Sequence, residues 1–200
     1  MKIQFEDLEI ELVSDQNFTP FSADNIIDYN FKYFAEEIEK QTCYLTSRLG
    51  ILVKNQTDFE EKLINSAIIC ETGGATGIYK DTFLIEEANL LICVCDKIYS
   101  ISLPTLELNW KVQADEATCF SIHRFSDGYI IHGELAITYL GKSGEILWQF
   151  LARDIFVTID SQKDFTIEND TIIVKDWSGY EYHLNADGKV IREIKPTHNN

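Results

Sequence analysis

Ser121, His123 and Asp127 have the side-chain types that nucleophilic catalysis requires, and they lie within one short stretch. Ser121 and His123 are two residues apart, so a strand would place them on the same face. A catalytic triad also needs a sharp turn that presents the nucleophile, or backbone amides that stabilise an oxyanion, and the sequence signals neither. We therefore interpret His123 as a hydrogen-bonded structural residue on a strand, and we predict no catalytic residues.

Cys93 and Cys95 form a Cys-x-Cys pair that could bind a soft metal ion from one face of a strand. Zinc sites commonly combine ligands from two such pairs, but no second pair follows, and the histidines are scattered. We predict that the cysteines are buried thiols and that the protein holds no metal and no cofactor. The odd number of cysteines and their apolar surroundings suit a reducing, cytosolic environment.

The net charge of −16 is the strongest compositional feature of the chain. Nucleic acids and anionic membranes bind proteins through Lys and Arg, so this charge argues against both as partners. Two interpretations stay open: a solvated acidic surface, or a face that docks onto a basic protein. The N-terminal 40 residues are the most acidic part, and they supply the first candidate partner-binding residues: Glu6, Asp7, Glu9, Glu11, Glu36 and Glu37.

A second candidate contact surface is the turn that contains Asp176, Trp177 and Tyr180. Trp and Tyr are enriched among the residues that dominate binding energy at protein interfaces. The alternative is that these residues serve turn geometry and aromatic packing between repeats.

The N-terminus has no basic start followed by an apolar run, so we expect no signal peptide. No stretch approaches the roughly 20 apolar residues of a membrane-spanning helix. These two observations lead us to expect a cytoplasmic protein.

The elements that must position these residues are short β-strands. Residues 2–13 alternate between apolar and acidic, with one slip at Glu6-Asp7, which predicts two strands joined by a turn or bulge. From residue 64 onward, apolar runs separated by Gly, Asn and Asp turns predict strands at 66–71, 81–86, 89–95, 97–103, 107–113, 117–124, 128–133, 135–140, 145–151, 154–160, 165–168, 171–176, 180–184 and 189–194.

The region between these two parts is less regular. Residues 22–40 fit the spacing of a helix or of a strand, and we favour a strand over 29–38 that forms a hairpin with 42–53. A Thr-x-x-Glu capping box then predicts one short helix over 58–64.

One phrase occurs three times, at Asn89–Trp110, Asp127–Trp148 and Asn169–Ile194. A period of about 40 residues with four strands in each copy is typical of a propeller blade. The phrase ITYLGKSGEILW, in which an aromatic strand and a polar turn ending in Gly precede a strand with Trp, resembles the repeats of quinoprotein-like β-propellers. The resemblance covers residues 81–194, and the third copy departs from it by having Ile191-Arg192 where Trp would stand.

We therefore predict an all-β, antiparallel fold: a partial or minimal β-propeller of three to four blade-like units, with an irregular N-terminal segment and one short helix. We expect a single domain, 1–200, in which an acidic segment, 1–63, packs on the blade-like repeats of 64–200. A full propeller has at least four blades, so the sequence leaves open whether the ring closes.

The expected function is that of a non-enzymatic, cytosolic binding protein with an acidic surface. Its specific form would be an immunity-type inhibitor that blocks a basic partner such as a bacterial nuclease toxin, because a nuclease needs a basic cleft. One alternative is a general interaction or scaffold module, and another is a small enzyme with a site at the blade axis. The resemblance to quinoproteins would imply a pyrroloquinoline quinone site, but in that family the site needs a closed ring, and this chain is short for the usual one.

Overall fold

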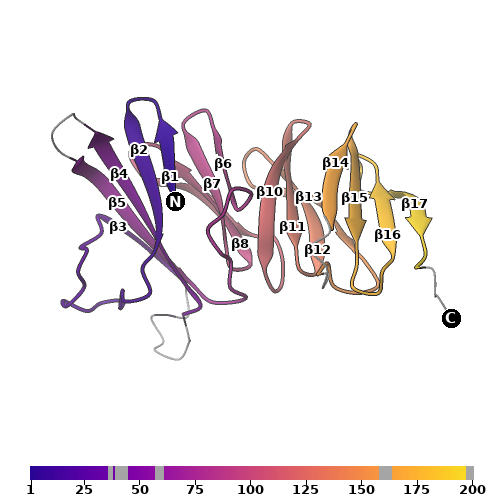
Figure 1. The fold of residues 1–200 in the computed structure, drawn as a ribbon, viewed down its shortest axis with the longest axis horizontal. Helices are drawn as coiled ribbons and strands as arrows, with labels where there is room; N and C mark the ends of the chain where they lie inside the picture. Colours follow the sequence, from indigo (N-terminus) through magenta and orange to yellow (C-terminus); the bar gives the residue numbers. More distant parts are fainter. Residues whose placement is uncertain (36–37, 39–44, 57–60, 158–163, 197–200) are drawn as a thin grey trace.

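The computed structural model describes residues 1–35, 38, 45–56, 61–157 and 164–196. These residues form seventeen strands in four sheets, which lie side by side along the longest axis of the molecule (Figure 1). The first and the fourth sheets occupy opposite ends of this row, so the sheets do not close into a ring. The all-β fold and the propeller-like repeats are confirmed, and the arrangement is an open one.

The first sheet has five strands in the order β1-β2-β4-β5-β3. The pairing of β1 with β2 around the turn at Glu6-Asp7 confirms the two strands predicted there, and Glu6 adopts a positive φ of 50° in that turn. The bounds of the strands are β1 (Lys2–Phe5), β2 (Leu8–Ser14), β3 (Phe31–Phe34), β4 (Ser47–Gln56) and β5 (Glu61–Glu71).

Two predictions for this region are wrong. The described part of the predicted helix, 61–64, belongs to β5, which pairs with β4 over its whole length because sheet hydrogen bonds outweigh one local capping signal. The predicted hairpin between 29–38 and 42–53 is also absent from the described residues, since β3 runs parallel to β5 instead.

Each of the other three sheets has four antiparallel strands in chain order, and each matches one copy of the repeated phrase. Most strands begin and end within two residues of their predicted bounds. The predicted strand at 154–160 is wrong over 154–157, which is irregular, while 158–160 lies outside the described residues. The bounds are β6 (Phe83–Glu86), β7 (Asn89–Val94), β8 (Lys97–Ser102), β9 (Leu108–Gln113), β10 (Cys119–Phe125), β11 (Gly128–Gly133), β12 (Ala136–Gly141), β13 (Ile146–Leu151), β14 (Phe165–Glu168), β15 (Thr171–Lys175), β16 (Glu181–Leu184) and β17 (Val190–Ile194).

The core consists of apolar layers between consecutive sheets. One layer joins the first sheet to the second, a second joins the second to the third, and a third joins the third to the fourth. A fourth cluster covers the outer face of the first sheet with side chains from the loop between β2 and β3, including Phe18 and Tyr29. Successive residues of a strand point to opposite faces, so inner strands such as β11 are buried on both sides.

The tryptophan of the repeat connects one sheet to the next. A Cβ atom on Gly144, in the β12–β13 turn, would lie 2.6 Å from the ring of Trp110 on the preceding sheet. Gly188 has the same relation to Trp148, whose indole Nε1 also donates to the Ala186 carbonyl at 3.0 Å. The aromatic residue and the turn glycine of the repeat are therefore a contact pair between neighbouring sheets.

The outer face of the fourth sheet is largely polar. Tyr182 and Leu184 point into the layer shared with the third sheet, so Glu181 and His183, which alternate with them on β16, point away from it. His183 lies opposite Arg192, the residue that replaces the repeat tryptophan. This face therefore carries an arginine where the second and third sheets present a tryptophan, beside Ile173 and Ile194, which lie opposite His183 and Glu181.

Candidate functional site

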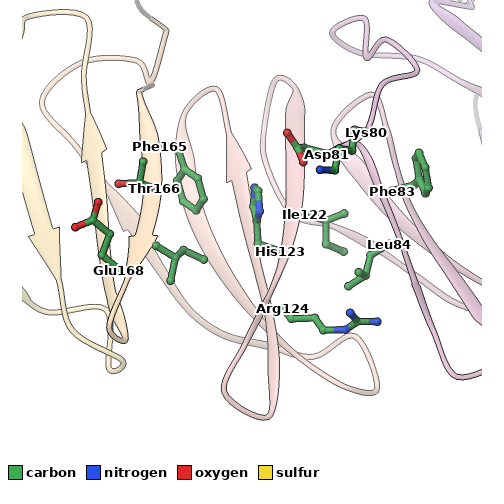
Figure 2. A pocket seen from close by; sticks show the side chains of 11 residues that line it. Lys80, Asp81, Phe83, Leu84, Ile122, His123, Arg124, Phe165, Thr166 and Glu168 are labelled. Atoms are coloured by element: carbon green, nitrogen blue, oxygen red, sulfur yellow. The ribbon is translucent and has the colours of Figure 1, made fainter. Parts of the chain in front are cut away.

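An open groove crosses the first strands of the second, third and fourth sheets (Figure 2). β6, β10 and β14 are each the edge strand of their sheet, so part of their backbone is free of sheet pairing on this side. The groove has a volume of about 700 Å³, and its lining residues are Lys80, Asp81, Phe83, Leu84, Ile122, His123, Arg124, Phe165, Thr166, Ile167 and Glu168.

A second hollow adjoins this groove and shares Asp81, His123 and Phe165 with it. It has a volume of about 520 Å³. The further residues that line it are Tyr79, Phe120, Ser121, His132 and Asp164. We call this second hollow the acidic–aromatic end of the groove, because its charged lining residues among those described are the two aspartates.

Stacked rings form a wall of the acidic–aromatic end. The β10–β11 register places Ser121 opposite His132, so His123 and His132 share the face that meets the fourth sheet. Phe165 of β14 stacks on both imidazoles, at 4.8 Å from His123 and 4.9 Å from His132 between ring centroids. Figure 2 shows the side chains of His123 and Phe165 side by side.

His132 is buried in this wall without a full set of hydrogen bonds. Its side chain is 8% exposed, and its Nε2 atom has no hydrogen-bond partner among the described residues. Burial, and then the neighbouring His123, lower the pKa of His132 to about 4, while the Phe156 backbone raises it slightly. Burial lowers the pKa of His123 as well, so both rings are neutral at physiological pH.

The lowered pKa of His132 predicts that acid destabilises the protein. The unfolded chain protonates His132 near pH 6.5, whereas the folded protein does so only near pH 4. Stability from this residue is therefore lost as the pH falls, by about 2 kcal/mol between about pH 7 and about pH 5. Urea unfolding at both pH values measures it, and His132→Phe, which keeps a ring, should flatten the dependence. Equal pH slopes for the two proteins would contradict the prediction.

Ser121 and His123 are hydrogen-bonded to each other, but Asp127 does not complete a triad with them. His123 Nε2 and Ser121 Oγ are 2.8 Å apart, as expected for a hydrogen-bonded strand histidine. Asp127 lies in the β10–β11 turn beyond Phe125, which pairs with Gly128 at the end of both strands. The geometry is that of a polar pair at the groove wall.

The acidic N-terminal candidates divide into exposed and paired residues. Glu6 and Asp7 are exposed in the β1–β2 turn. Glu9 is 2.8 Å from the Lys2 ammonium, and Glu11 accepts a hydrogen bond from Lys54 at 2.6 Å. The candidates Glu36 and Glu37 lie outside the described residues. Among those described, Glu6 and Asp7 are therefore the carboxylates of this group best placed to meet a partner.

The candidates in the β15–β16 turn also have different surroundings. Asp176 is fully buried, and its carboxylate accepts hydrogen bonds from the Tyr180 amide and the Tyr182 hydroxyl, both at 2.9 Å. Trp177 is 47% exposed, and the Arg153 guanidinium covers the Tyr180 ring at 5.0 Å. Asp176 thus holds the turn together, which leaves Trp177 as the accessible side chain.

Four cysteines of the described part of the chain are free and buried: Cys70, Cys93, Cys95 and Cys119. Burial raises the pKa of Cys70 and of Cys95 to about 12, so these thiols stay protonated at neutral pH. Cys95 follows the end of β7, so it does not share a strand face with Cys93. Within the described ranges, no group of three or more His, Cys, Asp or Glu could hold a metal ion.

His132, Phe165 and Asp81 were not among the candidate residues predicted from the sequence. They are far apart in the chain and meet only where the third and fourth sheets face the 79–82 turn. One signal was present, because His132 interrupts the apolar run of β11, whose residues are all buried. A histidine in a strand buried on both faces needs a partner for its ring nitrogens.

No family model matches this chain, and no curated protein matches it. Similar solved structures include the Neurospora crassa Pan2 WD40 domain, at 14% identity over 58% of this chain and 38% of that chain, with a TM-score of 0.47. BamB from Moraxella catarrhalis has 15% identity over 72% of this chain and 43% of its own, with a TM-score of 0.46. The designed protein Ika8 has 6% identity over 96% and 60%, with a TM-score of 0.49.

The chain therefore spans less than half the length of the Pan2 and BamB chains that it matches. The class of the protein follows from its own sheets: an open, propeller-like row in which three four-stranded antiparallel sheets follow one five-stranded sheet. No helix in the described residues is long and apolar enough to cross a membrane.

Proposed function

We propose that this chain is a non-enzymatic binding protein that docks onto a basic protein through its acidic surface. The observation that carries the proposal is the net charge of −16, together with the ion pairs that many of the basic side chains form within the chain. The basic side chains in these pairs are Lys2, Lys32, Lys54, Lys97, Arg124, Lys142, Arg153 and Lys189. The remaining bases cannot balance the other carboxylates, so the field around the protein is negative.

The specific form that we propose is an immunity-type inhibitor of a toxin such as a nuclease, acting in the cytoplasm. A nuclease must bind phosphate, so its active-site cleft is basic, and an acidic protein can occupy that cleft. Complementary fields speed such an association and favour the correct partner over neutral ones. The row of sheets supplies a rigid support for this surface.

Association with the partner is expected to depend strongly on salt. The test mixes the full chain with the product of the neighbouring open reading frame and measures association rates at about 50 mM and about 500 mM salt. We expect the rate to fall about tenfold or more, because salt screens the attraction between the two proteins. An unchanged rate would remove the basis of the proposal.

Charge reversal then locates the surface. Reversing Glu6 and Asp7 to Lys should slow association if the β1–β2 turn meets the partner. Reversing Glu87 and Asp127, which are exposed in the β6–β7 and β10–β11 turns, makes the same change of charge elsewhere and is the matched control. Equal association rates for the two double variants would place the β1–β2 turn outside the interface.

A further inference from the structure

The acidic–aromatic end of the groove combines features that suit a planar cation. Its charged lining residues, among those described, are Asp81 and Asp164, so the local potential favours a positive ligand. Phe120 and Phe165 add aromatic rings, and rings attract cations through their negative faces. The groove is open, so a side chain of another protein can enter it.

The unsatisfied nitrogen of His132 indicates the kind of group that this site lacks. His132 lines this end of the groove, and its Nε2 atom has no hydrogen-bond partner among the described residues. A neutral imidazole carries one hydrogen, and with that hydrogen on Nδ1 the Nε2 atom accepts a hydrogen bond from a donor.

We propose that the acidic–aromatic end of the groove binds the guanidinium group of an arginine side chain, presented by the basic partner. The inference rests on the proposed function, because it names the residue type with which that partner enters the groove. A guanidinium has five N–H donors and no acceptor, which matches two carboxylates and one unsatisfied nitrogen.

Arginine fits this site better than lysine. A guanidinium is planar, stacks on aromatic rings and can donate to several acceptors at once, whereas an ammonium is a compact and strongly hydrated charge. The nearest bases of the described part of the chain do not occupy the site. Lys80 borders only the wider groove, and Arg124 is held by Glu86 at 3.3 Å and by the Ile85 carbonyl at 2.5 Å.

The test is a titration of the full chain with N-acetyl-arginine amide, followed by NMR of the histidine rings. We expect saturable shifts of the His123 and His132 signals. N-acetyl-lysine amide has the same charge and should bind about tenfold more weakly at equal ionic strength. Equal binding of the two amides, or no saturable shift, would overturn the inference.

Variants distinguish binding at this site from a general effect of the protein's negative charge. Asp81→Asn and Asp164→Asn should each weaken binding of the arginine amide about tenfold, because each removes a charged acceptor. His132→Phe keeps the stacked ring, removes the acceptor and should also weaken it. Asp127→Asn makes the same change of charge outside the lining and should bind as the wild type does. Equal losses in Asp127→Asn and Asp81→Asn would overturn the inference.

The same variants distinguish this inference from the proposed function. Salt-sensitive binding of the basic protein that is unchanged in Asp81→Asn and Asp164→Asn would overturn the arginine site and support the proposed function. Arginine-amide binding without a salt-sensitive basic protein partner would support the site and overturn the proposed function.

Discussion

Replacing Asp115 with alanine is expected to lower the free energy of unfolding by about 4 kcal/mol. Asp115 is 2% exposed, and its carboxylate accepts four backbone N–H groups. Oδ1 accepts from Ala117 at 2.7 Å and Thr118 at 3.1 Å, and Oδ2 accepts from Leu135 at 2.9 Å and Ala136 at 2.8 Å. The substitution leaves these donors without a partner, and the bonds to Thr118 and Ala136 are buried.

Denaturant unfolding followed by tryptophan fluorescence measures this effect. Asp115→Asn is the informative intermediate, because its carbonyl oxygen can keep two of the bonds while its NH₂ group faces the other two donors. We expect its stability to lie between those of the wild type and Asp115→Ala. Asp127→Ala, which removes an exposed turn carboxylate, should change the stability by less than about 0.5 kcal/mol. A loss for Asp115→Ala as small as that of Asp127→Ala would contradict this account.

The second large effect is expected at the glycines that contact the repeat tryptophans. Gly188→Ala should cost about 3 kcal/mol, since it adds a steric clash to the cost of a left-handed backbone. Gly188 has a φ of +73°, and its Cβ atom would lie 2.6 Å from the Trp148 ring. Gly144→Ala should behave similarly, with a φ of +86° and the same distance to Trp110.

Gly179 provides the matched control for the backbone contribution. Its φ is +83°, but the nearest atom to an added Cβ is the Cβ of Pro196 at 3.2 Å. Gly179→Ala should therefore cost only about 1 kcal/mol. A double-mutant cycle with Trp148→Ala should remove most of the extra cost at Gly188, because the clash is then gone. Equal losses at Gly144, Gly179 and Gly188 would show that the Trp–Gly contact contributes nothing.

The strands of the repeats could be predicted because their signals are local. Alternation within β1 and β2, and turn residues such as Asp127-Gly128, need only the few residues on either side. The repeat also marked the Trp and Gly positions correctly, although the sequence did not show that the two residues touch across neighbouring sheets. Periodicity therefore identifies the unit but not its contacts.

The errors lie where the partner of a strand is distant or ambiguous. A capping box predicts a helix over 58–64 from four residues, whereas the β4–β5 pairing extends over two long strands. The alternating aromatic residues of β3 likewise predict a strand, but the sequence did not show that this strand pairs in parallel with β5. In both cases tertiary hydrogen bonding decided between local preferences of similar strength.

The candidate site shows the same division. The acidic composition predicts a basic partner, and that prediction rests on charge alone. The groove is lined by residues from three sheets and from the 79–82 turn. Asp176, which the sequence predicted to bind a partner, instead accepts hydrogen bonds within its own turn. Side-chain type alone does not show whether a carboxylate faces solvent or the backbone.

By itself the sequence determined most strands of the repeats, the three repeated units and the strongly negative charge, because these follow from residue type and short-range spacing. Only the tertiary structure decided that the sheets form an open row and that Phe165 stacks on two histidines beside two aspartates. Both depend on how apolar layers between whole sheets pack. That packing is set by many side chains at once, so no single motif records it.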